Sequence, residues 1–190
     1  EIWHLTNSLF SLLCIFGVYK LSSILFNKHV GKIIFILCFF NPIFFGHMAM
    51  NPKDSIIAFA NIWSTYIFIR YLQCQSRNDK RKHYVWLAGL TLGLGTGVRI
   101  LFFVTLIPLM LFALLDIFFI KKITNSRFSI KKFFVDLFLI FIIAYFLTIA
   151  AWPHVHTNIF FEPFKLFLAH LKNPFGVTWI LFDGNFHETN

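Results

Sequence analysis

The stretch of sequence that decides the fold is residues 133–152, which read FFVDLFLIFIIAYFLTIAAW and contain a single charged side chain, that of Asp136. A helix rises about 1.5 Å per residue, so about 20 apolar residues cross the hydrocarbon core of a bilayer, which is about 30 Å thick. An isolated strand cannot satisfy its backbone hydrogen bonds in hydrocarbon. Residues 133–152 are therefore predicted to form a transmembrane helix.

Similar apolar blocks recur upstream, so we expect an all-α membrane protein: a multi-pass helical bundle with about six transmembrane helices. The predicted spans are residues 8–26, 32–50, 54–72, 84–98, 100–120 and 133–152. Apolar residues make up 58% of the chain and charged residues only 13%, whereas soluble domains average about 25% charged residues. Residues 1–152 would form the bundle. The chain begins with Glu1 and is expected to be an internal piece of a larger module.

The basic residues indicate which way the bundle faces. The chain has a formal net charge of +9, and most of its positive charge falls in the connectors on one side. On that side lie 13 of the 17 lysine and arginine residues, namely Lys20, Lys28, Lys32, Arg70, Arg77, Lys80, Arg81, Lys82, Lys121, Lys122, Arg127, Lys131 and Lys132. Such a bias marks the cytoplasmic side of a membrane protein and argues against nucleic acid as a partner. We expect the opposite side to face outward from a bacterial inner membrane.

A turn is expected near residues 97–99, between the fourth and fifth spans. One continuous helix over residues 84–120 would place the basic residues 121–132 outside and break the charge asymmetry. The arm before the turn has about 14 residues and reaches only about 21 Å, which places Arg99 at the membrane boundary. Glycines four residues apart in this arm, Gly89, Gly93 and Gly97, would let a neighbouring helix approach closely.

The chain changes character after residue 152. Residues 158–172 place apolar side chains at helical spacing, with Glu162, Lys165 and Lys172 on the other side. The apolar set is Phe160, Phe164, Phe167, Leu168 and Leu171. This pattern predicts one external amphipathic helix lying on the outer membrane face. Residues 153–190 would form this truncated external part, with residues 176–190 as a loop.

The ionisable residues on the outer side are candidates for function, because polar groups at membrane depth are costly. We expect five of them to line one external cavity: His47, Lys53, Asp54, Arg99 and His154. His154 and His156 lack a third ligand, so the sequence predicts no metal site there.

Structural roles remain open for the same residues. Asn51, Pro52 and Asp54 fit the N-cap, the first position and the third position of a helix, where an acid meets the helix dipole. Arg99 could pair with Asp54 or with a lipid phosphate. Lys53 could be solvated, and His47 could bond a backbone carbonyl. Near the basic side, Asp116 and Asp136 are expected to be neutralised by adjacent lysines.

Three segments carry a resemblance to a known family. Residues 45–59, FGHMAMNPKDSIIAF, resemble a segment of bacterial membrane glycosyltransferases of the GT-C class, relatives of the dolichyl-phosphate-mannose protein mannosyltransferases (glycosyltransferase family 39). Residues 89–100, GLTLGLGTGVRI, look like a second such segment. Residues 152–154, followed by residues 173–184 (NPFGVTWILFDG), are similar to a third, and residues 3–7 (WHLTN) also fit.

The resemblance implies transfer of a sugar from a polyprenyl-phosphate carrier, in membrane lipid, to an unidentified acceptor on the outer face. Lys53 or Arg99 would stabilise the charge that leaves with the phosphate; these two, His47 and His154 are the candidate substrate-binding residues. Asp54 would be a catalytic second-site acid that contacts the acceptor or a divalent metal ion. The main base would lie in an acidic loop upstream of Glu1, so the chain is not expected to be active alone.

Two other classes stay open. A transporter or lipid flippase segment would carry charged or Gly/Pro-broken helices at mid-membrane, whereas the polar residues here gather on one side. A noncatalytic membrane scaffold would need its outer polar residues only for assembly.

Overall fold

The computed structural model describes residues 2–42, 44, 46, 52–121, 123–124, 128–172, 178–182 and 185–189. Its elements are α1 (Ile2–Leu25), α2 (Lys28–Phe39), α4 (Pro52–Cys74), α5 (Asn78–Val98), the 3₁₀ helix η1 (Ile100–Leu106), α6 (Ile107–Leu115), the π-helical turn η2 (Asp116–Ile120), α7 (Ile130–Ala151), the 3₁₀ helix η3 (Pro153–Thr157), α8 (Glu162–Lys172), β1 (Thr178–Phe182) and β2 (Asn185–Thr189).

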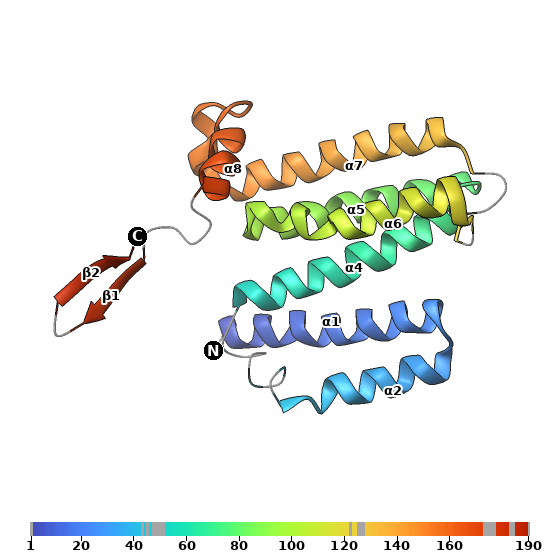
Figure 1. Ribbon diagram of the computed structural model, residues 1–190, viewed down its shortest axis with the longest axis horizontal. Helices are drawn as coiled ribbons and strands as arrows, with labels where there is room; N and C mark the ends of the chain where they lie inside the picture. The colour runs from blue at the N-terminus through green and yellow to red at the C-terminus, as the bar shows by residue number, and fades with distance from the viewer. Residues whose placement is uncertain are drawn as a thin grey trace.

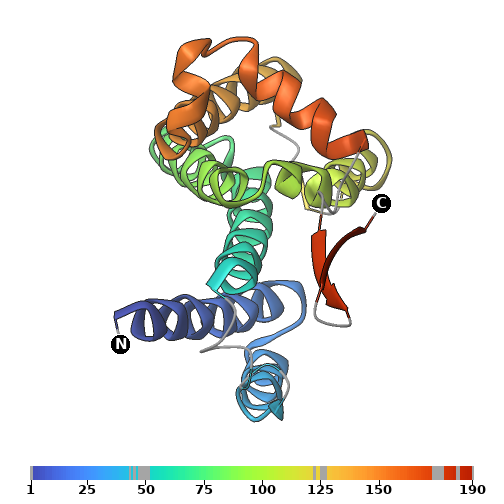
Figure 2. The ribbon, with the colours of Figure 1, turned by 90° about the vertical axis from the view of Figure 1, so that its left-hand side faces the viewer.

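The long helices lie side by side, in the order α2, α1, α4, then α5 with α6, then α7 (Figure 1). The bundle has two chemically different ends. We call one the basic end, because the α1–α2, α4–α5 and α6–α7 connections lie there with the lysine- and arginine-rich segments 77–82 and 131–132. The other is the α8 end, where α4 begins and α8 lies across the ends of its neighbours (Figure 2).

The prediction of a helical membrane protein is confirmed over the described residues. Four segments are long and apolar enough to cross a membrane: Ile2–Leu25, Lys53–Cys74, Ile100–Ile120 and Ile130–Ala151. The described part of α2 has 12 residues, and α5 begins with the polar run 78–83. The total of six spans therefore stays a prediction.

The expected turn between the fourth and fifth spans is present. Arg99 is extended, with φ −148° and ψ 117°, between the end of α5 and the start of η1. The following span starts as a 3₁₀ helix and becomes α-helical only at Ile107. Pro108 lies in the first turn of α6, where the absence of its N–H costs no helical hydrogen bond.

Glycines of α5 provide the close approach to α7 that their spacing predicted. A Cβ added to Gly89 would lie 2.6 Å from the Ile143 Cβ, and one added to Gly93 would lie 2.7 Å from the Leu147 Cβ. These distances leave no room for a side chain. Next to this contact the Thr96 and Thr148 hydroxyls are 2.6 Å apart and form a buried hydrogen bond between α5 and α7.

The C-terminal part agrees with the prediction in one respect and differs in another. The expected amphipathic helix exists as α8, and Phe164, Leu168 and Leu171 on it are exposed. The expected loop over residues 176–190 instead contains the antiparallel pair β1–β2, in which Phe182 pairs with Asn185. Asp183-Gly184 separates the strands in sequence, and this dipeptide favours two-residue hairpin connections.

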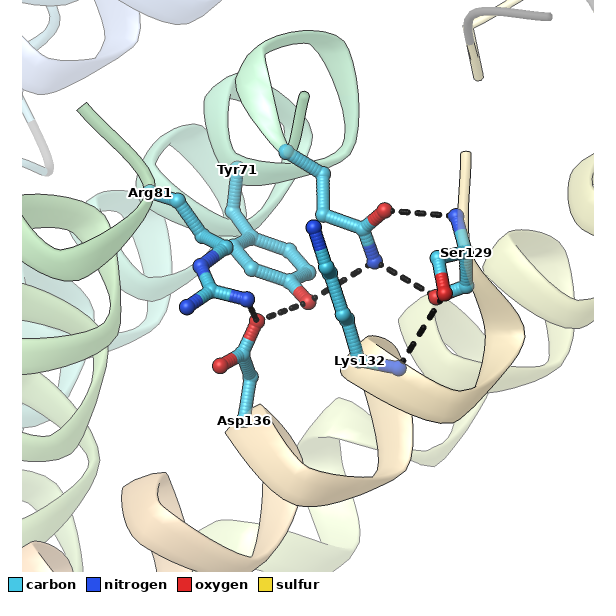
Figure 3. Close-up of polar contacts among 6 residues, drawn as sticks. Tyr71, Arg81, Ser129, Lys132 and Asp136 are labelled. Atoms are coloured by element: carbon cyan, nitrogen blue, oxygen red, sulfur yellow. Dashed lines mark hydrogen bonds and ion pairs between the residues drawn. The ribbon is translucent and has the colours of Figure 1, made fainter. Parts of the chain in front are cut away.

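A buried polar network joins α4, α5 and α7 at the basic end (Figure 3). The Tyr71 hydroxyl donates to Asp136 Oδ2 at 2.7 Å, and Arg81 Nη1 lies 3.8 Å from the same oxygen. Gln75 extends the network, because its amide donates to the Ser129 carbonyl at 2.9 Å and accepts from the Ser129 N–H at 2.7 Å. The prediction that adjacent lysines neutralise Asp136 is wrong: Arg81, far away in sequence, folds against it.

Replacing Asp136 by Ala should destabilise the bundle strongly, because Arg81 and the Tyr71 hydroxyl would lose their buried partner. We expect a cost of about 3 kcal/mol, seen as a fall in melting temperature of about 8 °C in detergent. The control is Glu162→Ala, which removes the more exposed Glu162–Lys165 pair (2.8 Å) and should cost less than about 1 kcal/mol. Equal shifts for both variants would contradict a structural role for the network.

Candidate functional site

A cavity of about 510 Å³ with four polar residues in an otherwise apolar lining opens at the α8 end between α4 and η1. Its polar lining residues are Asp54, Asn61, Arg99 and Thr105, and its apolar ones are Ile57, Ala58, Ile62, Leu101 and Phe102. The volume falls in the range of small-molecule sites, about 300–1,000 Å³. We call this cavity the polar pocket.

One face of α4 forms the first wall. Asp54, Ile57, Ala58 and Asn61 follow the three- and four-residue spacing that keeps side chains on the same side of an α-helix. Asp54 lies in the first turn of α4 and is exposed, beside the positive end of the helix dipole. Asn61 lies two turns further along, about 10 Å from Asp54 along the helix axis.

The 3₁₀ winding of η1 forms the second wall. Side chains three residues apart eclipse one another in a 3₁₀ helix, so Phe102 and Thr105 line the polar pocket together, with Arg99 directly before the helix. Continued α-helical winding would rotate Thr105 by about 60° relative to Phe102. The local helix type therefore decides which side chains reach the pocket.

A second row of side chains on η1 borders a second cavity. Ile100, Phe103 and Leu106 line an apolar cavity of about 780 Å³ between α5, α6, α7 and α8. Phe164 and Phe167 of α8 also line it, and the Phe103 and Phe167 ring centroids are 5.1 Å apart. The 3₁₀ helix η1 thus contributes side chains to the linings of both cavities.

Contacts from α5 and α7 hold the backbone around Arg99 beside the polar pocket. Its backbone N–H donates to the Gly95 carbonyl at 3.0 Å. The Trp152 indole N–H, at the end of α7, donates to the Gly97 carbonyl at 2.6 Å. A Cβ on Gly95 would lie 2.4 Å from the Phe102 ring, so η1 can fold back over α5 only because residue 95 has no side chain.

The structure brings together two of the five predicted site residues. Asp54 and Arg99 line the same pocket from different helices. Lys53 is exposed beside Asp54 but is not among the residues that line the pocket. His47 and the His154 side chain lie outside the described residues. The roles of all five stay predictions.

Asn61 and Thr105 are pocket residues that the sequence analysis missed. The Asn61 Nδ2 donates to Thr105 Oγ1 at 3.0 Å, across the pocket from α4 to η1. A signal for Asn61 was present, because it follows Asp54 by seven residues and therefore shares its helix face. For Thr105 no such signal exists, since its direction depends on the 3₁₀ winding.

The sequence left open a divalent metal ion that contacts Asp54. In the part of the chain that the structure describes, no three His, Cys, Asp or Glu side chains cluster in a way that could hold a metal ion. Asp54 is the single carboxylate among the described pocket residues. The pocket is instead suited to an anion that meets Arg99 and to hydroxyl groups that meet Asp54 and Asn61.

Comparison with known proteins identifies a family. The family model described as dolichyl-phosphate-mannose-protein mannosyltransferase matches residues 3–152 of the 190-residue chain. No curated protein and no solved structure matches the chain significantly. The matched region contains both walls of the polar pocket.

Adding a methyl group at position 95 should disturb the pocket wall. We expect Gly95→Ala to cost about 2 kcal/mol, because the new Cβ overlaps the buried Phe102 ring, with the loss measured as a lower melting temperature. In a Phe102→Ala background the same change should cost clearly less. Gly46→Ala, with no atom within 4 Å of the added Cβ, is the control and should be neutral. An equal cost of Gly95→Ala in both backgrounds would show that Phe102 is not the obstacle.

Proposed function

The chain belongs to the dolichyl-phosphate-mannose-protein mannosyltransferase family, and on this premise we propose that its polar pocket takes part in moving a sugar from a polyprenyl-phosphate carrier to an acceptor hydroxyl. The observation that carries the proposal is the meeting of Asp54 and Arg99 in one cavity at the α8 end. Family membership implies a lipid-linked sugar donor; the acceptor and the membrane face belong to the proposal.

Arg99 is suited to the phosphate of the donor. Its guanidinium offers a planar fork of N–H donors that matches two phosphate oxygens. When the sugar departs, the carrier phosphate gains negative charge, and a cation fixed at that place stabilises the transition state more than the ground state. The extended backbone at Arg99, fixed through Gly95, Gly97 and Trp152, keeps the cation in place.

Asp54 is suited to the acceptor hydroxyl or to a metal ion that assists it. A carboxylate can accept a hydrogen bond from a hydroxyl and draw its proton away as the new glycosidic bond forms. Asp54 and Arg99 lie on opposite walls of the pocket, so acceptor and donor phosphate can approach the sugar from two sides. We assign Asp54 as a second-site acid.

The apolar cavity gives the carrier's hydrocarbon a place beside the reaction. It is lined by Ile100, Phe103 and Leu106 of η1, the helix that begins directly after Arg99. Its lining consists mainly of Phe, Leu and Ile side chains. An amphipathic donor with its phosphate at Arg99 would therefore keep its isoprenoid chain in an apolar environment.

We further propose an orientation of the bundle in the membrane. The basic end would face the cytoplasm, following the distribution of lysine and arginine, and the polar pocket would face the outside of a bacterial inner membrane. With α2 and α5 counted, the chain would cross the membrane six times. The helix α8 would then lie on the outer leaflet, with its exposed Phe and Leu side chains in contact with lipid.

Substitutions in the full-length protein test the pocket. We expect Arg99→Ala to lower turnover by about 100-fold or more, because the departing phosphate loses its cation. Asp54→Ala should lower turnover by at least about tenfold. The measurement is the transfer of radiolabelled mannose from polyprenyl-phosphate mannose into protein and lipid fractions. Lys53→Ala should have the smallest effect of the three, and Lys165→Ala on α8 is the control. Unchanged transfer in Asp54→Ala and Arg99→Ala would overturn the site assignment.

Cysteine labelling tests the orientation. With Cys14, Cys38 and Cys74 replaced by Ser, single cysteines would be introduced as Lys53→Cys and Lys132→Cys, both at exposed positions. A membrane-impermeant maleimide should label the first in intact cells and the second only after lysis. Labelling of both in the same compartment would contradict a bundle with these two residues at opposite faces.

A further inference from the structure

A polar contact in the lining of the polar pocket, between half-buried Asn61 and exposed Thr105, contains an amide with unused hydrogen-bonding capacity. Asn61 Nδ2 donates to Thr105 Oγ1 at 3.0 Å, and Thr105 Oγ1 donates to the Phe102 carbonyl at 2.6 Å. A threonine hydroxyl has one hydrogen, and here the Phe102 carbonyl takes it. Asn61 must therefore turn its NH₂ group, and not its carbonyl, toward Thr105.

This arrangement leaves the Asn61 carbonyl oxygen available as an acceptor for a molecule bound in the pocket. Among the residues that the structure describes, none donates a hydrogen bond to Asn61 Oδ1. Asn61 is half-buried, lines the pocket and lies about 10 Å along α4 from Asp54. A polar group in a half-buried position costs free energy when it has no hydrogen-bond partner, so a bound partner at Oδ1 would be favourable.

We propose that Asn61 is a substrate-binding residue that accepts a hydrogen bond from a hydroxyl group of the transferred sugar, with Thr105 as the positioning residue that orients its amide. This inference rests on the proposed function and deepens it. The amide oxygen selects the part of the substrate, because a hydroxyl can donate to it, whereas the carrier's phosphodiester oxygens and its hydrocarbon chain cannot. The pyranose is the part of the donor that carries several hydroxyls.

The position of Asn61 supports the same assignment. Arg99 directly precedes η1, and Thr105 lies one 3₁₀ turn beyond Phe102 on that helix. A phosphate at Arg99 would place the attached sugar between Arg99 and Asn61, beside the apolar Phe102 and Ile57 side chains. Asn61 would then accept a hydrogen bond from one hydroxyl group of the sugar.

A merely structural role for the pair makes a different prediction. If the hydrogen bond served only to hold η1 against α4, removing either partner would have the same effect. Thr105→Val keeps the shape of the side chain and removes the oxygen that accepts from Asn61. Asn61→Leu keeps a similar shape and removes both the tie and the carbonyl oxygen. The two roles therefore separate in the comparison of these variants.

The experiment measures kcat/KM of the full-length protein with polyprenyl-phosphate mannose and with its 2-, 3-, 4- and 6-deoxy analogues. We expect the wild type to disfavour one deoxy analogue by about tenfold more than the others, the effect of one lost hydrogen bond. Asn61→Leu should lower kcat/KM for the parent donor by about tenfold, mainly through KM, and should no longer discriminate against that analogue. Thr105→Val should lose about threefold and keep the discrimination.

Thr65→Val is the matched control. Its hydroxyl donates to the Asn61 backbone carbonyl at 2.9 Å on the same helix, outside the residues that line the pocket, and it should leave every ratio unchanged. Asn61→Ala serves as the second variant if Asn61→Leu lowers the melting temperature.

Three results would overturn the inference. Asn61→Leu could keep wild-type kcat/KM. It could lose activity equally with all donors and to the same extent as Thr105→Val, which would show a structural tie. It could raise KM for the acceptor alone while the deoxy discrimination persists, which would assign Asn61 to the acceptor. Failure of the wild type to transfer mannose at all would instead overturn the proposed function, and this inference with it.

Discussion

The close packing of α5 on α7 is the constraint on which the rest of this structure depends. Gly89 and Gly93 leave no space for side chains at that contact, and in lipid, helix association relies on such close approach because no hydrophobic effect drives it. The contact brings the end of α7 beside the end of α5. There the Trp152 indole bonds the Gly97 carbonyl, two residues before Arg99, so the packing of two helices determines where the candidate phosphate-binding cation lies.

The second determinant is the winding of the short segment after Arg99. Gly95 allows η1 to fold back over α5, and Pro108 starts a new helix immediately after it. From Ile100 to Leu106 the chain adopts 3₁₀ geometry, in which side chains three residues apart share a face. Arg99, Phe102 and Thr105 face the polar pocket, and the row starting at Ile100 faces the apolar cavity. An amphipathic substrate needs such a division, with polar and apolar surfaces a few ångströms apart.

The two ends of the bundle use polar residues differently. At the basic end, Asp136 has its hydrogen bond from Tyr71 and its ion pair with Arg81 inside the protein, so that network stabilises the fold. At the α8 end, Asp54, Asn61 and Arg99 line an open cavity, where a bound molecule can supply further partners. Of the two, the end with a cavity beside its polar side chains is the better place for a substrate.

The sequence by itself determined the class of the protein, the hairpin at Arg99, the glycine contact and the amphipathic α8, because lipid forces long apolar blocks into helices and charge asymmetry restricts how they connect. It also pointed to Asp54 and Arg99 as residues of one outer cavity. It missed the β1–β2 hairpin, the Arg81 partner of Asp136, and both Asn61 and Thr105. The hairpin and Asn61 had local signals, namely the Asp183-Gly184 dipeptide and the helix face shared with Asp54. The Arg81 partner and Thr105 depended on which helix faces meet and on a 3₁₀ turn in place of an α turn. Such choices are made by contacts between residues far apart in the chain, which periodicity and composition do not encode.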